Sequence, residues 1–205
     1  YVGVDARREP SMRMPRPAIS RTTGSPNACT RGHEDKTDGW AHDALREWGV
    51  TGRFTDLNLA KARMAADRGD MRALPTLESL VADEAASPLM RASVIEQMSN
   101  LGSRQLPTAA AMLLRADHPV LRTSAVRSMQ AMPPTPLYLM LRPFIDDVSL
   151  SVRMEVAQLL AGVPESELRP KDNAELNLLF AEYLAVQSDH LDMPSVQLQL
   201  ANFWL

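Results

Sequence analysis

The single cysteine of the chain, Cys29, lies four residues before His33 in the run Asn-Ala-Cys-Thr-Arg-Gly-His-Glu-Asp-Lys. A thiol and an imidazole at this spacing permit several kinds of chemistry. With His42 and a carboxylate from Asp35 or Asp38, they could bind zinc. As a pair they could form a catalytic thiolate and its base, although no third group that would orient the imidazole is evident. The simplest interpretation is a free cysteine and a surface histidine in a loop.

The same spacing matches part of the attachment site for haem c, which reads Cys-x-x-Cys-His. In such a site two thiols bond the vinyl groups of the haem, and the histidine ligates the iron. Gly32 stands where the second cysteine would be. The residues therefore allow a single attachment through Cys29, with His33 as one axial ligand and Met12 or Met14 as the other.

No other stretch of the sequence suggests catalysis. Acidic pairs such as Asp146 and Asp147 fall at the ends of expected helices, where solvated carboxylates are common. The methionines fall largely at expected core positions, and no glycine-rich phosphate loop is present. We therefore expect no enzymatic activity.

Composition limits the classes of partner. The 205 residues carry a formal net charge of -3, which argues against a general nucleic-acid binder. Residues 1–31 carry six arginines against Asp5 and Glu9 and so contribute +4, while the remainder contributes -7. No apolar run approaches the roughly 20 residues that a membrane-spanning helix needs. The chain opens at Tyr1 without a secretory signal, so we expect a fragment or a processed product.

Three arginines, Arg91, Arg122 and Arg153, recur at a constant spacing of 31 residues, and the apolar residues around them recur with them. A fixed period of this length is typical of stacked helical hairpins, because one hairpin cannot bury its own apolar face. We expect the arginines to form a structural ladder that hydrogen-bonds loop carbonyls or carboxylates such as Asp117 and Asp147. The alternative is an anion-binding ridge on the concave face.

The period predicts three hairpins over residues 71–163. Pro75 and Pro107 open two of the first helices, and Pro88 and Pro119 open two of the second helices, where a missing N–H costs nothing. The expected first helices cover 71–84, 104–116 and 135–146, and the second helices cover 88–101, 119–132 and 149–162. A patch along Met90, Val94, Leu121 and Val152 would favour partner binding if it were exposed.

The flanking regions are less regular. Residues 1–37, rich in proline and arginine, predict an irregular basic arm. Residues 38–70 predict two leading helices, the first capped by Asp38 and ending at Gly49, the second capped by Asp56 and ending near Gly69. A polar linker over 164–173 interrupts the period. Residues 174–205 then predict one longer helix and the start of a tetratricopeptide-like repeat.

The second helices resemble those of HEAT-like repeats, whose second helix carries an Asp-Pro…Val-Arg signature. The best match is made by Asp117, Pro119, Leu121 and Arg122. Ala86 replaces the aspartate of the first copy, and Leu150 replaces the proline of the third. In the last segment, Leu200, Ala201 and Trp204 are similar to the Leu, small-residue and aromatic positions of a tetratricopeptide repeat.

The chain as a whole resembles the C-terminal part of a multihaem cytochrome c region that is followed by HEAT-like and then tetratricopeptide repeats. The N-terminal stretches that carry this resemblance are Tyr1–Arg8, Pro15–Pro17, Pro26–Cys29, Asp35–Lys36 and Trp40–Ala41. In that family a histidine that could act as the second axial ligand follows the paired arginines, but Glu9 and Pro10 stand here. With Gly32 also in place of a cysteine, the haem site resembles one that has decayed.

These observations predict an all-α protein, an α-solenoid of HEAT-like hairpins with a right-handed superhelix and an irregular N-terminal arm. The expected function is a non-enzymatic interaction scaffold that binds a protein or peptide, or other domains of the same polypeptide. We expect no binding to nucleic acid and no membrane-spanning segment. The alternative is an electron-transfer module that holds haem c through Cys29 and His33. The resemblance implies a bacterial periplasmic location.

Overall fold

The structure, a computed structural model, describes residues 16–49, 57–164, 166, 168–169 and 172–203. Every regular element in these ranges is a helix, so the all-α prediction is confirmed. The chain divides into two compact units, Tyr1–Met64 and Ala65–Leu205. No helix among the described residues combines the length and the apolar character that crossing a bilayer requires.

The first unit contains helices α1 (Pro17–Thr23), α2 (Ala28–Gly32) and α3 (Asp38–Glu47). The prediction of an irregular arm is therefore wrong for much of its described part. Prolines in a sequence favour irregular structure, but Pro17 lies in the first turn of α1, where proline is tolerated. Helix α1 packs against α3 and buries Ala18, while α3 buries Ala41.

The N-terminus of α3 differs from the prediction by one residue. Thr37, rather than Asp38, caps this helix by accepting a hydrogen bond from the N–H of Trp40 at 3.2 Å. The carboxylate of Asp38 is used elsewhere, as described below. Helix α4 (Leu57–Asp67) corresponds to the second leading helix of the prediction. Its expected cap, Asp56, lies outside the described residues.

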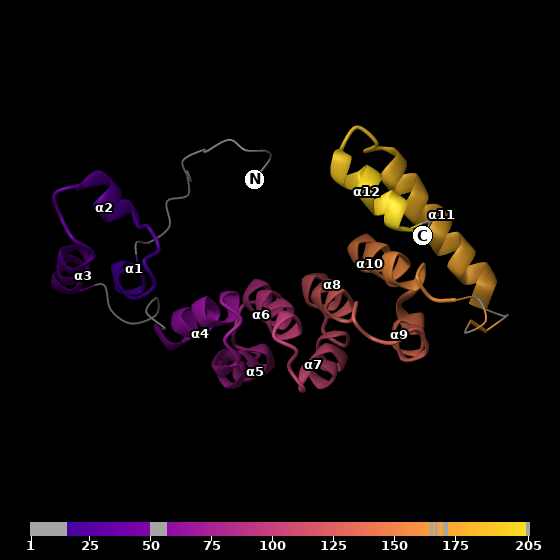
Figure 1. Ribbon diagram of the computed structural model, residues 1–205, viewed down its shortest axis with the longest axis horizontal. Helices are drawn as coiled ribbons and strands as arrows, with labels where there is room; N and C mark the ends of the chain where they lie inside the picture. The colour runs from indigo at the N-terminus through magenta and orange to yellow at the C-terminus, as the bar shows by residue number, and fades with distance from the viewer. Residues whose placement is uncertain (1–15, 50–56, 165, 167, 170–171, 204–205) are drawn as a thin grey trace. The chain divides into compact units, whose positions relative to one another are not determined.

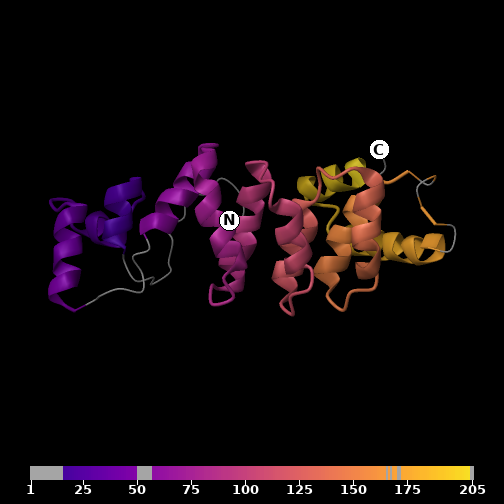
Figure 2. The ribbon, with the colours of Figure 1, turned by 90° about the horizontal axis from the view of Figure 1, so that it is seen from below.

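The second unit contains the three expected helical hairpins, and then a fourth pair of helices (Figures 1 and 2). Most of the helices end one to four residues before the predicted positions, as is common for boundaries that are read from sequence. The elements are η1 (Met71–Ala73), α5 (Leu74–Ala82), α6 (Pro88–Asn100), α7 (Leu106–Leu113), α8 (Pro119–Ser128), α9 (Pro134–Leu141), η2 (Arg142–Phe144), α10 (Leu150–Leu160), α11 (Asn173–Ser188) and α12 (Pro194–Phe203).

The second helices of the hairpins pack against one another in chain order. Helix α6 contacts α8, α8 contacts α10, and α10 contacts α11, while each second helix also contacts its own first helix. In Figure 1, the first helices α5, α7 and α9 all lie on one side of the row formed by α6, α8 and α10. The first helices make fewer contacts with one another than the second helices do.

The apolar core of this row repeats with the period of the sequence. Each second helix buries three side chains at equivalent positions, and all nine are at most 2% exposed. They are Val94, Ile95 and Met98 in α6, Ala125 and Val126 in α8 with Met129 at its C-terminal cap, and Val156, Ala157 and Leu160 in α10. Burial of this kind contributes roughly 25 cal/mol per Å² of apolar surface, and it requires the neighbouring hairpins.

Helix α11 is joined to the preceding hairpin by a buried polar cluster. Asp172, just before α11, accepts a hydrogen bond from the hydroxyl of Tyr138 in α9. The Nε of Arg142 lies 2.6 Å from the same carboxylate. Burial, followed by the hydrogen bond to Asp172, raises the pKa of Tyr138. This cluster holds α11 against the hairpin although the linker interrupts the 31-residue period.

Candidate functional site

Helix α2 places Cys29 and His33 on consecutive turns of the chain. The side chain of Asn27 caps this helix by accepting a hydrogen bond from the N–H of Thr30 at 3.2 Å. The N–H of His33 donates to the carbonyl of Cys29 at 2.8 Å, which closes the turn. The spacing of four residues therefore brings the thiol and the imidazole to the same side of a short helix.

Asp38 ties this short helix to α3. Its Oδ1 accepts hydrogen bonds from the Nδ2 of Asn27 at 2.5 Å and from the hydroxyl of Thr30 at 3.3 Å. Asn27 is buried, so the bond to its amide satisfies a group that has left water. Asp38 thus positions the segment that carries Cys29 and His33.

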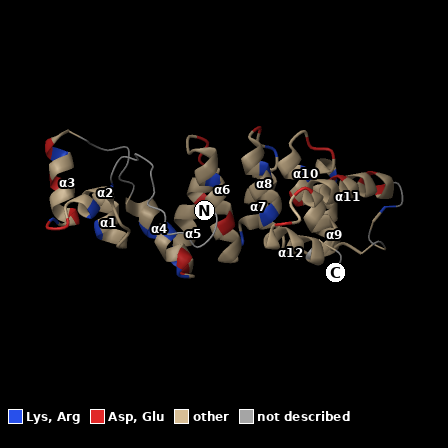
Figure 3. Ribbon diagram, turned by 90° about the horizontal axis from the view of Figure 1, so that it is seen from above, with Lys and Arg blue, Asp and Glu red and all other residues tan. Residues whose placement is uncertain are grey.

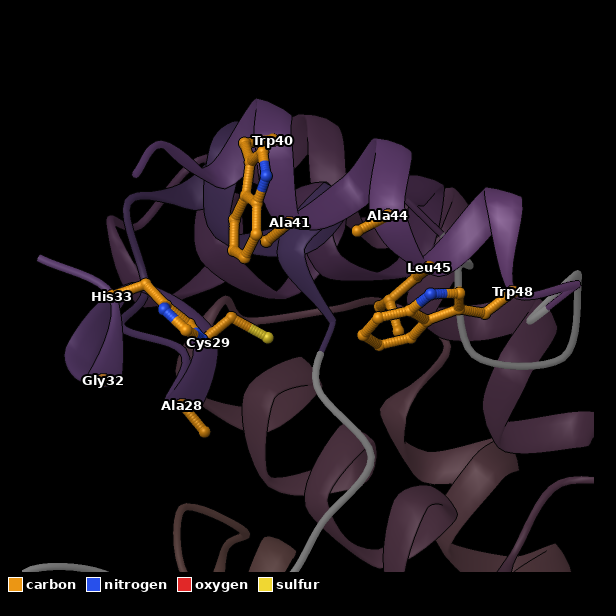
Figure 4. Close-up of a pocket in the computed structure, with 9 residues that line it drawn as sticks. All are labelled: Ala28, Cys29, Gly32, His33, Trp40, Ala41, Ala44, Leu45 and Trp48. Carbon is orange, nitrogen blue, oxygen red and sulfur yellow. The ribbon is translucent and has the colours of Figure 1, made fainter. Parts of the chain in front are cut away.

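A pocket of about 250 Å³ lies between α2 and α3 (Figure 4). The sulfur of Cys29 points into it, towards the space between the rings of Trp40 and Trp48. The ring of His33 meets that of Trp40 edge to face, with 5.1 Å between the ring centroids. The lining residues are Ala28, Cys29, Gly32, His33, Trp40, Ala41, Ala44, Leu45 and Trp48.

The pocket is mostly apolar, and its aromatic walls are accessible to solvent. Trp40 is 39% exposed and Trp48 is 74% exposed. The sequence did not connect the helix face that carries Trp40, Ala44, Leu45 and Trp48 with Cys29. The missing information was tertiary, because the hydrogen bonds of Asp38 bring α2 against this face.

The structure does not assemble the zinc site. Among the described residues, no group of three or more His, Cys, Asp or Glu side chains could hold a metal ion. His42 does not line the pocket. Asp38, one of the two carboxylates considered as a fourth ligand, accepts hydrogen bonds from Asn27 and Thr30 instead.

The pair Cys29 and His33 also lacks the orienting group that a catalytic thiolate would need. Within residues 16–49, the structure shows no hydrogen bond from either side chain, and the imidazole contacts the ring of Trp40. The position of the second haem thiol is open as well. A Cβ added at Gly32 would meet nothing within 4 Å, so the site lacks the thiol but not the space for one.

The repeat arginine Arg122 joins two hairpins. Its Nη1 donates to the carbonyls of Ala116 and Asp117 at 2.9 and 2.8 Å, at the end of its own hairpin's loop. Its Nε and Nη2 donate to the two carboxylate oxygens of Asp147 at 2.8 and 2.9 Å. The expected bonds of Arg122 to loop carbonyls and to Asp147 are confirmed, but Asp117 contributes its carbonyl, not its carboxylate.

Asp147 lies between two arginines of the ladder. Its carboxylate accepts from Arg122 and from the N–H of Ser149, and its backbone carbonyl accepts from Nη1 of Arg153 at 2.7 Å. Burial alone would raise the pKa of Asp147, but the hydrogen bonds from Arg122 and Ser149 outweigh it and hold this pKa below its ordinary value.

Arg153 repeats the arrangement with the helix that follows. Its Nε and Nη2 donate to the carboxylate of Glu182 in α11 at 2.8 and 2.5 Å, and the hydrogen bond lowers the pKa of Glu182. Arg91 differs, because its Nε donates to the carbonyl of Val81 at 2.9 Å and no carboxylate accepts from it in the described part of the chain.

The apolar patch that would favour partner binding is buried at three of its four residues, and only Met90 is partly exposed. Val94, Leu121 and Val152 are at most 3% exposed and belong to the core. Apolar side chains near the starts of second helices are exposed instead, with Leu89 at 70% and Val148 at 92%. Sequence periodicity did not separate these two groups, because both contain aliphatic residues on the same helices or next to them.

The sequence also did not identify an exposed ion-pair network across the second helices. Arg127 in α8 pairs with Glu96 in α6 at 3.2 Å and with Glu155 in α10. Because Glu96 lies 31 residues before Arg127, the repeat period could have indicated this pair; Glu155 lies 28 residues after Arg127, one helical turn before the equivalent position. In Figure 3, positive and negative residues are interspersed along the helices of the hairpins.

Comparison of the chain with family models, curated proteins and solved structures finds no match.

The hydrogen bonds of Asp38 lead to a prediction for the pocket. Replacing Asp38 with Ala should loosen α2 and raise the rate at which iodoacetamide alkylates Cys29 by about fivefold, the equivalent of a hydrogen bond worth about 1 kcal/mol. The rate is measured by intact mass against time. Asp43→Ala, an exposed change on the same helix, is the control. Equal rates in all three proteins would show that Asp38 does not position the thiol.

The bonds of Arg122 lead to a prediction for stability. Arg122→Ala should lower the free energy of unfolding by about 1 to 3 kcal/mol, because two loop carbonyls and the buried Asp147 lose their partner. Denaturant unfolding of the full chain measures the change. Arg115→Ala, at an exposed position in the preceding loop, should change stability by less than about 0.5 kcal/mol. An unchanged midpoint for Arg122→Ala would remove the structural role of the ladder.

Proposed function

We propose that the chain is a non-enzymatic protein-interaction scaffold, in which an α-solenoid of HEAT-like hairpins presents its second helices to a protein or peptide partner. The observation that carries this proposal is the row α6, α8, α10, in which each second helix packs on the next. A continuous row of equivalent helices gives an extended surface, which is the property that repeat proteins use for binding.

The repeated core supports the solenoid interpretation. Val94, Ala125 and Val156 are completely buried at positions 31 residues apart, so each hairpin uses the same face to contact its neighbours. The stability of such an arrangement depends on interfaces between adjacent repeats. The greater contact among second helices than among first helices favours a curved row with the second helices on the inner side.

The exposed side chains of the second helices support a polar binding surface. Arg127 spans α6, α8 and α10 through Glu96 and Glu155, and its side chain is 52% exposed. The hydroxyls of Thr123 and Ser151 lie 3.2 Å apart on α8 and α10. Exposed charges and hydroxyls of this kind give specificity to a protein or peptide partner and contribute little to the stability of the free chain.

The same proposal covers the class of partner and the location. A net charge of -3 and interspersed charges favour a protein partner, or another domain of the same polypeptide, over nucleic acid. The resemblance of the sequence to a multihaem cytochrome c region favours the bacterial periplasm as the site of action.

The scaffold proposal is tested with peptides selected against the full chain from a random display library. Arg127→Ser should weaken the selected peptides by about tenfold, because an exposed anchor is lost from the second-helix surface while the fold is retained. Binding is measured by titration calorimetry. Leu139→Ser, an exposed change on the first helix α9, is the control. Loss of binding in the control but not in Arg127→Ser would contradict the assigned face.

The second candidate function is an electron-transfer module with haem c, and the observation that favours it is that Cys29 and His33 line one pocket. The fit is partial. Cys29 would hold the haem through one thioether and His33 would ligate the iron, while Gly32 provides no second thiol and both Met12 and Met14 lie outside the described residues. A bound haem supplies one-electron redox chemistry, and the apolar walls of the pocket would limit its contact with water.

An absorption spectrum separates the two candidates. The full chain is produced in a host that matures c-type cytochromes, and its spectrum and intact mass are recorded. The scaffold proposal predicts a colourless protein at its polypeptide mass, because the site has a single thiol. A Soret band together with a covalent haem mass, both lost in Cys29→Ser, would make electron transfer the leading function.

A further inference from the structure

The three repeat arginines are not equally satisfied. Arg122 and Arg153 each bind a carboxylate from the next helical element, Asp147 and Glu182, through two nitrogen donors. The next element after Arg91 offers no such partner in the described part of the chain. The ladder therefore has one arginine whose carboxylate position is open.

Repeat geometry explains why this position is open. Asp147 corresponds to Ala116, 31 residues earlier. The backbone is the same at both positions, since the N–H of Ala116 donates to the carbonyl of Leu113 at 3.1 Å and that of Asp147 donates to Phe144 at 3.3 Å. Both carbonyls also accept from an arginine Nη1. Residue 116 is therefore placed as Asp147 is, but its methyl group accepts no hydrogen bond.

Arg91 is a nearly buried cation with unused donors. The residue is 9% exposed, and only its Nε has a hydrogen-bond partner among the described residues, the carbonyl of Val81. Its two terminal nitrogens are not among the fully buried polar atoms that lack a partner, so they retain access to solvent. A largely buried guanidinium with no carboxylate partner among the described residues gains free energy when a carboxylate binds its free donors.

We propose that Arg91 is a binding site for a carboxylate group that takes the place occupied by the side chain of Asp147 in the next repeat. The ligand accepts hydrogen bonds from the guanidinium of Arg91, as Asp147 accepts them from Arg122 and Glu182 accepts them from Arg153. The ligand is either a small organic acid or an acidic side chain of a bound protein.

The site is distinct from the exposed surface around Arg127 and stands whether or not the scaffold proposal is correct. A general attraction of anions to the second unit would not explain such binding, because acidic and basic residues are interspersed on its helices. The specificity comes from one desolvated guanidinium whose planar donors match a carboxylate in two-point geometry.

The test compares thermal unfolding of the full chain in sodium acetate and in sodium chloride at equal ionic strength and pH 7. Acetate should raise the Tm of the wild type by about 2 °C or more relative to chloride. Ala116→Asp places a carboxylate at the open position from within the chain. This variant should melt higher than the wild type in chloride and should lose the additional response to acetate.

Ala116→Asn is the matched control, since it has the size of aspartate without the charge. It should keep the acetate response of the wild type. Equal acetate responses in the wild type and Ala116→Asp would show a general salt effect and would overturn the proposal. So would a wild type that responds equally to acetate and chloride, or an Ala116→Asp variant that melts no higher than Ala116→Asn.

A second pair of probes identifies the source of the carboxylate. They are the acetylated and amidated peptide Gly-Gly-Glu-Gly-Gly and its Gln counterpart, each titrated by calorimetry. Binding of the Glu peptide at concentrations below those needed for acetate, with no binding of the Gln peptide and none to Ala116→Asp, assigns the site to an acidic protein segment. An acetate response without binding of the Glu peptide assigns it to a small organic acid.

Discussion

The bidentate bond between Arg122 and Asp147 is the polar contact that ties the second hairpin to the third. A helical hairpin has two apolar faces and can bury only one of them against itself, so its neighbours must be held in register. Arg122 does this with one side chain, because the same guanidinium satisfies the loop carbonyls of its own hairpin and the carboxylate of the next. The backbone carbonyl of Asp147 accepts a hydrogen bond from Arg153, and Arg153 also donates to Glu182 in α11.

This arrangement explains why the repeat tolerates differences between its copies. Apolar burial at Val94, Ala125 and Val156 is common to all three hairpins and supplies the larger part of the stabilisation. In the described part of the chain, Arg91 has a carbonyl as its partner, Arg122 an aspartate in a loop and Arg153 a glutamate in a helix. A repeat can therefore lose its internal acid while its core keeps the fold, and the arginine is then free to bind an acid from elsewhere.

The first unit depends on a different polar group for a similar purpose. Asp38 does not cap α3. Its carboxylate accepts hydrogen bonds from Asn27 and Thr30 instead, and these bonds place α2 beside α3. The pocket of Cys29, His33 and the two tryptophans is a consequence of that placement. In both units a carboxylate contact joins neighbouring elements, through Asp38 in the first and through Asp147 in the second, beside the apolar surfaces that those elements bury.

The sequence by itself determined that the protein is helical, where the hairpins lie, and which arginines are equivalent, because the 31-residue period and the prolines of the first turns are local signals. It also indicated the pairing of Arg122 with Asp147. It did not reveal helices α1 and α2, because the prolines in α1 and before α2 resemble those of a loop. Only the tertiary structure decided that Val94 is buried while Leu89 is exposed, that Asp38 holds α2 rather than capping α3, and that Arg91 has no carboxylate partner among the described residues. Each of these depends on which elements meet in space, and a contact between distant residues leaves no periodic trace in the chain.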